Sequence, residues 1–467
     1  MTQAESKPEV LLVSCYELGH QPLGLASPMA FLARAGIPVS AIDISVEPLE
    51  RLDKELVQRA RLVAISVPMH TALRLGSRVA QRVRDLNPGC HICFYGLYAT
   101  LNADYLLENG ADSIAGGEYE QSLVELAQAL NDRLPVRGVR QLASFATPVL
   151  KRLAFPVPLR KGLPPLERYA HLEQNGHLGL VGSVVASRGC LHFCRHCPIP
   201  PVYQGRFFVV PKEVVLQDIR QLVAAGATHI TFADPDFLNG PGHSLAIARA
   251  LHQDFPSVTF DFTAKVEHLL QHQSLLSELE RLGCLFIVSA LESLSNLVLH
   301  ELDKGHTRED AIEALGLVRG AGIALRPTWV SFTPWTTLRD YLDVLEWVEE
   351  EDLVDHVDPV QFTVRLLVPP GSMLLERASI QPFLEPLAPE AFTYPWRHPD
   401  PTMDALHAQA SQVVEAATSS NEDALVTFTR ICDLAWSMDG EEPRRRPRLP
   451  APAQRARAPR LTEAWFC

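Results

Sequence analysis

The stretch Ser187-Arg188-Gly189-Cys190-Leu191-His192-Phe193-Cys194-Arg195-His196-Cys197 determines how the whole sequence of 467 residues is interpreted. Its three cysteines, Cys190, Cys194 and Cys197, follow a C-x3-C-x2-C spacing that places three thiolates on one short loop. Three thiolates hold three irons of a cubane cluster and leave the fourth iron without a protein ligand. An open iron of this kind can bind a further molecule.

A structural zinc site is the alternative interpretation of this loop. Soft thiolates also bind zinc, and His192 or His196 would complete a set of four ligands. Such zinc sites usually consist of two separated ligand pairs, and no second pair follows at the expected distance. The other C-x2-C, Cys90-His91-Ile92-Cys93, begins an apolar run that is typical of a buried strand. Side chains three apart on a strand point to opposite faces, so we expect Cys90 and Cys93 to be core residues.

Composition narrows the class of protein. With 47% hydrophobic and 21% charged residues, the chain can bury large cores, and its length predicts two or three domains. The formal net charge of -13 argues against a general nucleic-acid-binding surface. No apolar run reaches 18 residues, and Met1 to Glu9 carries acids where a secretory segment would carry positive charge. We therefore expect no membrane partner and a reducing, cytoplasmic location, which an exposed cluster would also require.

The first 131 residues alternate short apolar segments with segments of helical spacing. The expected strands are 9–14, 38–43, 62–67, 90–96 and 112–115, and the expected helices are 27–35, 73–86, 103–109 and 120–131. This alternation predicts an α/β domain with a doubly wound, flavodoxin-like parallel sheet. Ligands of such sheets bind beyond the carboxyl ends of the strands.

From Gly179 onward, strands and helices alternate again. Beyond the cysteine loop, helices are expected at 212–225, 243–254, 271–282, 308–321 and 338–349, and strands at 229–233, 258–263, 284–290, 323–332 and 360–368. This order predicts a partial (β/α)6 barrel whose active site lies at the carboxyl ends of its strands.

The cysteine spacing, the aromatic His196 before the third cysteine and the strand that enters the loop together resemble the radical SAM superfamily. The resemblance implies that Cys190, Cys194 and Cys197 hold a [4Fe-4S] cluster. It also implies that S-adenosylmethionine (SAM) binds the open iron, and that one electron then cleaves it to a 5′-deoxyadenosyl radical. An electron donor such as a flavodoxin or a ferredoxin is implied as well. The substrate, a peptide or a small metabolite, and the catalytic residues stay unknown.

Charged residues at the ends of the expected strands match positions at which this superfamily contacts SAM. Asp234 stands in the turn that contacts the methionine amino group, and a capping aspartate is the alternative. Lys265 and Glu267 match a basic residue and an acid near the carboxylate and ribose, and a surface ion pair is the alternative. Glu292, followed by Lys304-Gly305-His306-Thr307, resembles the family's G-x-E-S and K-G-x-T patterns, with Ala290 in place of the glycine.

Because it precedes this core, the N-terminal segment resembles the cobalamin-binding domain found in the same superfamily. Gly116-Gly117-Glu118-Tyr119-Glu120 is similar to that domain's Gly-Gly-Glu turn. The D-x-H-x-x-G motif, whose histidine ligates cobalt, is absent, and His20 has neither the aspartate nor the spacing. Whether cobalamin is a cofactor therefore stays open. With it, methyl transfer is the favoured reaction; without it, another radical modification is expected.

The expected cobalamin-binding-like domain spans residues 1–135, and a proline-rich linker that crosses a surface spans 136–178. The radical SAM core is expected at 179–382, and a helical region over the barrel mouth at 383–440. Residues 441–467 are expected to be a disordered proline- and arginine-rich tail. The final Ala464-Trp465-Phe466-Cys467 resembles the CUAEP/CCAEP-tail radical SAM (seleno)proteins, in which a cysteine precedes selenocysteine or cysteine and then Ala-Glu-Pro. We hypothesise that a UGA codon for selenocysteine was read as a stop after Cys467. The rival function is a zinc-stabilised, two-domain ligand-binding adaptor without radical chemistry.

Overall fold

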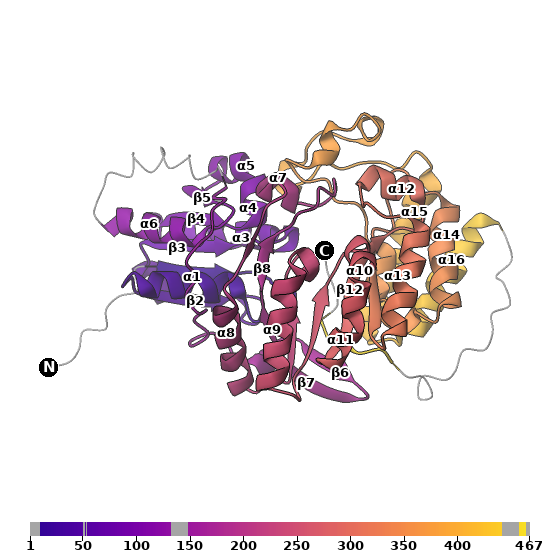
Figure 1. Cartoon of the computed structure of the whole chain (residues 1–467). Helices are drawn as coiled ribbons and strands as arrows, with labels where there is room; N and C mark the ends of the chain where they lie inside the picture. The colour runs from indigo at the N-terminus through magenta and orange to yellow at the C-terminus, as the bar shows by residue number, and fades with distance from the viewer. Residues whose placement is uncertain (1–9, 50–51, 53, 132–147, 441–456, 464–467) are drawn as a thin grey trace.

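The computed structural model describes residues 10–49, 52, 54–131, 148–440 and 457–463. An N-terminal α/β domain, indigo to purple in Figure 1, lies beside a catalytic domain coloured magenta to orange. The expectations for the acidic N-terminal segment, for most of the tail and for Cys467 fall outside the described residues. Within the described ranges, no helix is long and apolar enough to cross a membrane.

The N-terminal domain is the doubly wound parallel sheet that the sequence predicts. Its strands are β1 (Val10–Ser14), β2 (Val39–Asp43), β3 (Leu62–Ser66), β4 (His91–Tyr95) and β5 (Ser113–Ala115), in the order β2-β1-β3-β4-β5. Each neighbouring pair is parallel. The helices α1 (Leu23–Arg34), α3 (His70–Leu86), α5 (Ala103–Glu108) and α6 (Glu120–Asn131) overlap those expected. Two further helices, α2 (Lys54–Arg59) and α4 (Leu97–Leu101), are too short to show a helical period in the sequence.

The two thiols of the second C-x2-C lie in the interior of this domain, as expected. Cys93 packs in one hydrophobic core and Cys90 in the other. They therefore face opposite sides of β4 and do not form a chelating pair.

The catalytic domain is a curled sheet of seven strands in the order β13-β12-β11-β10-β7-β6-β14. Five of them are parallel and form the predicted half barrel: β7 (His177–Val184), β10 (His229–Phe232), β11 (Thr259–Thr263), β12 (Cys284–Glu292) and β13 (Ala324–Trp329). The connecting helices α8 (Lys212–Ala224), α9 (Pro241–Asp254), α13 (Arg308–Gly320) and α14 (Leu338–Glu350) confirm the predicted alternation. The helix expected at 271–282 is instead divided into α10 (Val266–Gln271) and α11 (Leu276–Arg281).

The sixth barrel strand expected at 360–368 is wrong. Pro359–Thr363 forms a 3-10 turn, and a single bridge between Phe332 and Arg365 continues the sheet there. Proline fixes φ in a helical range and has no amide to donate to a strand ladder. The apolar residues after Pro359 therefore begin in a turn.

The other edge of the sheet carries two strands that the sequence did not predict. The strand β6 (His171–Gln174) forms an antiparallel hairpin with β7, and β14 (Arg460–Leu461) pairs with β6. The tail is therefore not disordered throughout, because residues 457–463 are ordered against this edge. The composition of the tail indicates only that it cannot build a core of its own, and it leaves open that the tail completes another sheet.

The linker also differs from its expected role of crossing a surface. Arg160 is buried and donates two hydrogen bonds to Asp218, at 2.9 and 2.8 Å, and one to the Ser183 carbonyl, at 2.6 Å. One residue earlier in the linker, the Leu159 amide donates to the carbonyl of Ala26 in α1. The linker thus attaches the two domains to each other.

The helical region after the barrel consists of α15 (Pro401–Ser420) and α16 (Ala424–Asp439). The two helices pack on each other, and α16 packs on α14. Figure 1 shows them beside α13 and α14, so they extend the outer helical layer and do not cover the barrel mouth.

Candidate active site

The cysteine loop lies at the carboxyl ends of the barrel strands, after β7 and the short strand β8 (Ser187–Gly189). Cys194 is buried, and Cys190 and Cys197 are partly buried. Burial raises the pKa of the Cys190 thiol, and it raises the pKa of Cys197 to about 12. Metal binding requires the thiolate, so a bound metal would have to offset this cost of burial.

The loop supplies three thiolates, and a tetrahedral zinc site would need a fourth ligand beside them. Zinc–sulfur bonds of about 2.3 Å would place tetrahedral sulfurs about 3.8 Å apart. In the part of the chain that the structure describes, only His192, Asp236 and His268 bring three potential ligand atoms within 4.8 Å of one another. The three cysteine sulfurs are not part of this compact group.

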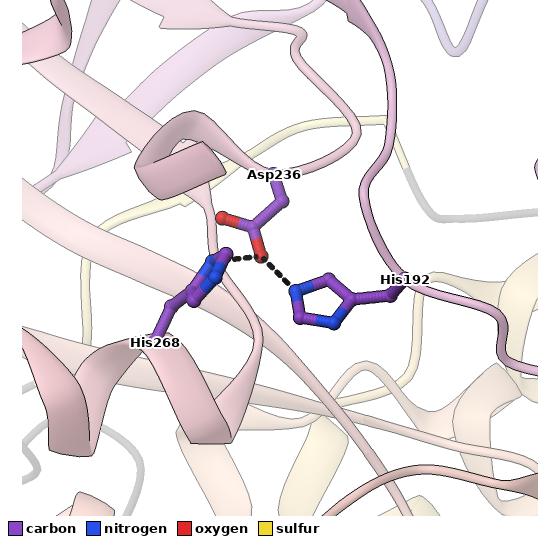
Figure 2. A group of neighbouring side chains, drawn as sticks. All are labelled: His192, Asp236 and His268. Atoms are coloured by element: carbon purple, nitrogen blue, oxygen red, sulfur yellow. Dashed lines mark hydrogen bonds and ion pairs between the residues drawn. The ribbon is translucent and has the colours of Figure 1, made fainter. Parts of the chain in front are cut away.

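His192, Asp236 and His268 connect the cysteine loop to the ends of β10 and β11 (Figure 2). His268 Nδ1 lies 2.8 Å from Asp236 Oδ2, and His192 Nε2 lies 3.9 Å from the same oxygen. The carboxylate also accepts the Lys265 amide at 3.2 Å and the Leu238 amide at 2.9 Å. Protein groups already surround the Asp236 carboxylate. We therefore call His192, Asp236 and His268 the Asp236 clamp, which orients the cysteine loop. The sequence analysis did not single out Asp236 or His268, although Asp236 lies in the same turn as Asp234.

Glu292 occupies the end of β12 and faces the cysteine loop, as its sequence pattern predicts. Its Oε1 lies 3.1 Å from His196 Nε2 and 3.2 Å from Lys304 Nζ. Burial alone would raise the pKa of Glu292, but the Lys304 ammonium and the His196 contact outweigh burial and lower its pKa to about 2. Its φ of 65° lies in the left-handed region, which is costly for a residue with a side chain. A strained, ionised carboxylate beside the loop is a feature typical of a functional site.

Lys265 and Glu267 form an ion pair of 3.1 Å beside the same loop. Lys265 Nζ also lies 3.2 Å from His192 Nδ1. Gly305, in the turn after Lys304, approaches both side chains closely. A Cβ at this position would lie 3.0 Å from Glu267 Oε2 and 3.2 Å from Lys265 Nζ, and its φ of 73° favours glycine. The two pattern segments that the sequence analysis matched separately are therefore adjacent in space.

Asp234 lines the same space, but protein groups use both of its oxygens. Oδ1 accepts the Ser187 hydroxyl at 2.6 Å, and Oδ2 accepts the Ala186 amide at 2.8 Å. Burial raises the pKa of Asp234 to about 7 despite these bonds. Asp234 thus holds the segment after β7, whereas the capping aspartate of this turn is Asp236, which accepts the Leu238 amide.

A cavity of about 520 Å³ lies between the two domains. Its N-terminal wall consists of loops after the sheet strands and contains several small residues, namely Gly24, Ser66, Pro68, Gly96 and Gly117. Its other wall contains barrel residues such as Thr231, Asp234, Asp261, Val288 and Arg326. The carboxyl ends of both sheets thus open into one space. A wall of small residues leaves room for a flat macrocycle such as a corrin.

His20 also lines this cavity, next to charged groups of the barrel. Burial lowers the pKa of His20 to about 4, although the nearby Asp261 carboxylate raises it. The imidazole is therefore neutral at pH 7.

A buried charge network joins the N-terminal domain to the strand that enters the cysteine loop. Arg188 lies 2.6 Å from Glu120 Oε1 and 3.6 Å from Glu118 Oε2. Both glutamates come from the Gly-Gly-Glu turn, and both are fully buried. Burial raises the pKa of Glu118 to about 7, against the lowering effect of Arg188. No local sequence pattern indicates this interdomain contact.

Two family models match this chain. Residues 184–348 match the Radical SAM superfamily, and residues 9–127 match the B12 binding domain. The chain is therefore a radical SAM enzyme that carries a B12 binding domain in front of its catalytic core. These matches support the predicted [4Fe-4S] cluster, SAM and cobalamin as its cofactors, and they do not favour the zinc adaptor.

Some known proteins resemble the chain over most of its length and others over part of it. An uncharacterized methyltransferase of Pyrococcus horikoshii is 22% identical over 410 residues, covering 84% of this chain and 85% of the relative. A tRNA-2-methylthio-N(6)-dimethylallyladenosine synthase of Fusobacterium nucleatum is 25% identical, but this match covers only 36% of this chain and 40% of the relative.

Solved structures share the fold. OxsB, a cobalamin-dependent SAM radical enzyme with aqua-cobalamin and SAM bound, has a TM-score of 0.65 at 15% identity, covering 88% of this chain and 67% of that chain. TsrM from Kitasatospora setae, a radical SAM methyltransferase, has a TM-score of 0.56 at 18% identity, covering 74% and 71%. These likenesses confirm the predicted order of a B12-binding-like sheet followed by a radical SAM half barrel.

Proposed function

We propose that this enzyme transfers a methyl group to a peptide or a small metabolite in a reaction that depends on SAM and cobalamin. The observation that carries the proposal is the shared cavity, since loops of the B12-binding-like sheet and the residues that flank the cysteine loop, Ser187 to Gly189 and Ile199, line the same space. When bound, the cluster supplies the electron that cleaves SAM, and cobalamin supplies methyl-transfer chemistry. The methyltransferase name of the Pyrococcus horikoshii relative points to the same reaction.

The chain's own residues would bind and orient these groups. Cys190, Cys194 and Cys197 would ligate the cluster, and Glu292 would accept hydrogen bonds from the SAM amino group or ribose. Lys265 would pair with the SAM carboxylate, for which its ammonium, 9% exposed, is well placed beside the loop. Glu267 would accept ribose hydroxyls, and Asp234 would hold the turn next to the methionine end through its bonds to Ser187 and Ala186.

Anaerobic reconstitution with iron and sulfide separates the radical enzyme from a zinc adaptor. We expect about four irons and four sulfides per chain and a brown absorbance for the wild type. Cys190→Ala should lose most of the iron, whereas Cys432→Ala, which changes a buried cysteine of α16 away from the loop, should retain it. One tightly held zinc per chain and no cluster would contradict the proposal.

Titration with hydroxocobalamin tests the cobalamin part. We expect one corrin per chain that stays bound during anaerobic gel filtration. Leu97→Trp places an indole in the N-terminal side of the cavity and should weaken binding at least about tenfold. Leu297→Trp makes the same change at an exposed position, 56% accessible, outside the cavity and should leave binding unchanged. Equal binding by both variants would show that the corrin does not enter this cavity.

Three finer points are proposals that rest on the sequence. An oxygen-sensitive cluster needs a reducing compartment, so we keep the cytoplasm as its location. A flavodoxin or ferredoxin would supply the electron. Membership of the CUAEP/CCAEP-tail family of radical SAM (seleno)proteins is the third point, and it rests on the resemblance of the last four residues.

A further inference from the structure

The C-terminal strap, which we define as residues 457–463, is bound along an edge of the catalytic sheet. Its strand β14 pairs antiparallel with β6, with Arg460 opposite Glu173 and Leu461 opposite Leu172. The His171 amide donates to Thr462 Oγ1 at 2.9 Å, and the Thr462 amide donates to the His171 carbonyl at 2.8 Å. Main-chain pairing with an open sheet edge is the way in which many domains bind extended peptides.

The strap also contacts the opposite end of the sheet. Strands β14 and β13 are the two ends of the strand order, yet Arg326 on β13 donates to the Pro459 carbonyl at 3.4 Å. Arg326 is buried and lines the cavity. The strap therefore crosses the open side of the half barrel, with its main chain held from both sides.

Alternate side chains of the strap point into the cavity. Leu461 packs against Leu172, Val181, Phe286 and Val288, and it lines the cavity together with Glu463. Glu463 Oε1 accepts the Tyr16 hydroxyl at 2.8 Å, so the strap reaches the N-terminal domain. Directly before Leu461, the Arg460 side chain forms an outer ion pair with Glu173 at 2.8 Å. This alternation is that of an extended ligand whose side chains enter pockets at every second position.

Contacts outside the cavity hold the strap weakly. Its β pairing spans only two residues, and the side chains of Arg457 and Arg460, which make its ion pairs, are 42% and 34% exposed. Exposed ion pairs of this kind contribute little, and salt screens them. An extended chain with the same side-chain pattern would make the same contacts.

We propose that the edge of β6 and the adjoining cavity wall form a binding groove for an extended peptide, which the strap occupies in cis. The ligand would carry an apolar residue, an acidic residue two positions later and a basic residue directly before the apolar one, as Arg460, Leu461 and Glu463 do. The inference that such a peptide is the enzyme's substrate rests on the proposed function. The inference that the groove binds such a peptide does not depend on that function.

The experiment uses a fluorescein-labelled peptide with the sequence of residues 457–463 and measures fluorescence anisotropy without a reductant. A chain truncated after Ala456 should bind this peptide saturably. The full chain should bind it at least about tenfold more weakly, because the tethered copy competes at a millimolar effective concentration. A peptide with serine in place of Leu461 and Glu463 should not bind to either chain.

A full-length variant guards against misfolding of the truncated chain. Leu461→Asp should release the strap and bind the wild-type peptide as the truncated chain does. Leu297→Asp, the same change at an exposed position in α12 (Asn296–Leu302), should behave as the wild type. Absence of saturable binding in both the truncated chain and Leu461→Asp would overturn the proposal, and so would loss of fold in both, since the strap would then be a permanent part of the barrel. The measurement needs no radical chemistry, so failure of SAM cleavage would leave its outcome unaffected.

Discussion

The buried contact between Arg188 and the Gly-Gly-Glu turn gives the sharpest prediction about how the two domains are joined. Arg188→Met removes the only cation that the described residues place against Glu118 and Glu120. Breaking a buried pair by removing one partner costs about 3–5 kcal/mol, because an uncompensated charge stays buried. The folded variant can avoid a buried unpaired charge only if both Glu118 and Glu120 carry a proton.

The size of this effect depends on pH. Protonating a glutamate of ordinary pKa costs about 1.4 kcal/mol per pH unit above roughly 4.3, which is about 4 kcal/mol at pH 7.5 and about 2 kcal/mol at pH 5.5. When folding raises the pKa of a carboxyl, the folded protein loses stability as pH rises. The free energy of unfolding of Arg188→Met should therefore fall most, relative to the wild type, at the higher pH. The burial that raises the pKa of Glu118 to about 7 acts in the same direction in the wild type.

Urea unfolding at pH 5.5 and pH 7.5 measures the difference. We expect Arg188→Met to lose about 4 kcal/mol at pH 7.5 and about half of that at pH 5.5. Adding Glu120→Gln should recover most of the loss, since the pair is then removed together. Arg249→Met, which breaks an exposed ion pair with Glu278, is the control and should leave the unfolding midpoint unchanged. An equal loss at both pH values, or no recovery in the double variant, would refute the reasoning.

Three further predictions concern the site and the cavity. Gly305→Ala should weaken SAM binding about tenfold in equilibrium dialysis, because its Cβ would crowd Glu267 and Lys265 at a φ of 73°, and unchanged affinity would contradict the placement of these side chains. His268→Phe should lower the iron retained after reconstitution by loosening the Asp236 clamp, whereas His272→Phe, on the next turn, should not. Equal iron in both variants would show that the clamp does not hold the cysteine loop. Glu17→Gln should flatten the decline of stability between pH 4.5 and pH 7, since burial raises the pKa of Glu17 from 4.5 to about 7 and its ionisation therefore costs stability as pH rises through this range, and a parallel decline in both chains would show another group to be responsible.

Much of the fold was predictable because local sequence periods encode it. The strands β1 to β5 and β10 to β13 are apolar runs bounded by turn residues, and they lie within a few residues of where the sequence places them. The sixth barrel strand failed because Pro359 starts a turn inside an apolar stretch. The edge strands β6 and β14 could not be found, since β14 is two residues long and is defined by its partner rather than by its own pattern.

The same division applies to the site. Cys190, Cys194 and Cys197 could be proposed as ligands because they lie close together in the sequence, and Glu292 could be proposed because its pattern is local; their roles stay predictions. Arg188, His268 and the strap were missed, since their contacts join segments far apart in the chain. Asp234 shows the reverse case, in which a local pattern pointed to a ligand and the structure shows both oxygens bound by protein groups.

The central claim is that three sulfurs of one loop hold a cluster at which this chain cleaves SAM. The most direct measurement is a single-turnover assay under anaerobic conditions, with dithionite as reductant and 5′-deoxyadenosine quantified by mass spectrometry. We predict about one 5′-deoxyadenosine per reconstituted chain, none from Cys190→Ala and an unchanged amount from Cys432→Ala. A fully reconstituted wild-type chain that releases no 5′-deoxyadenosine would contradict the account.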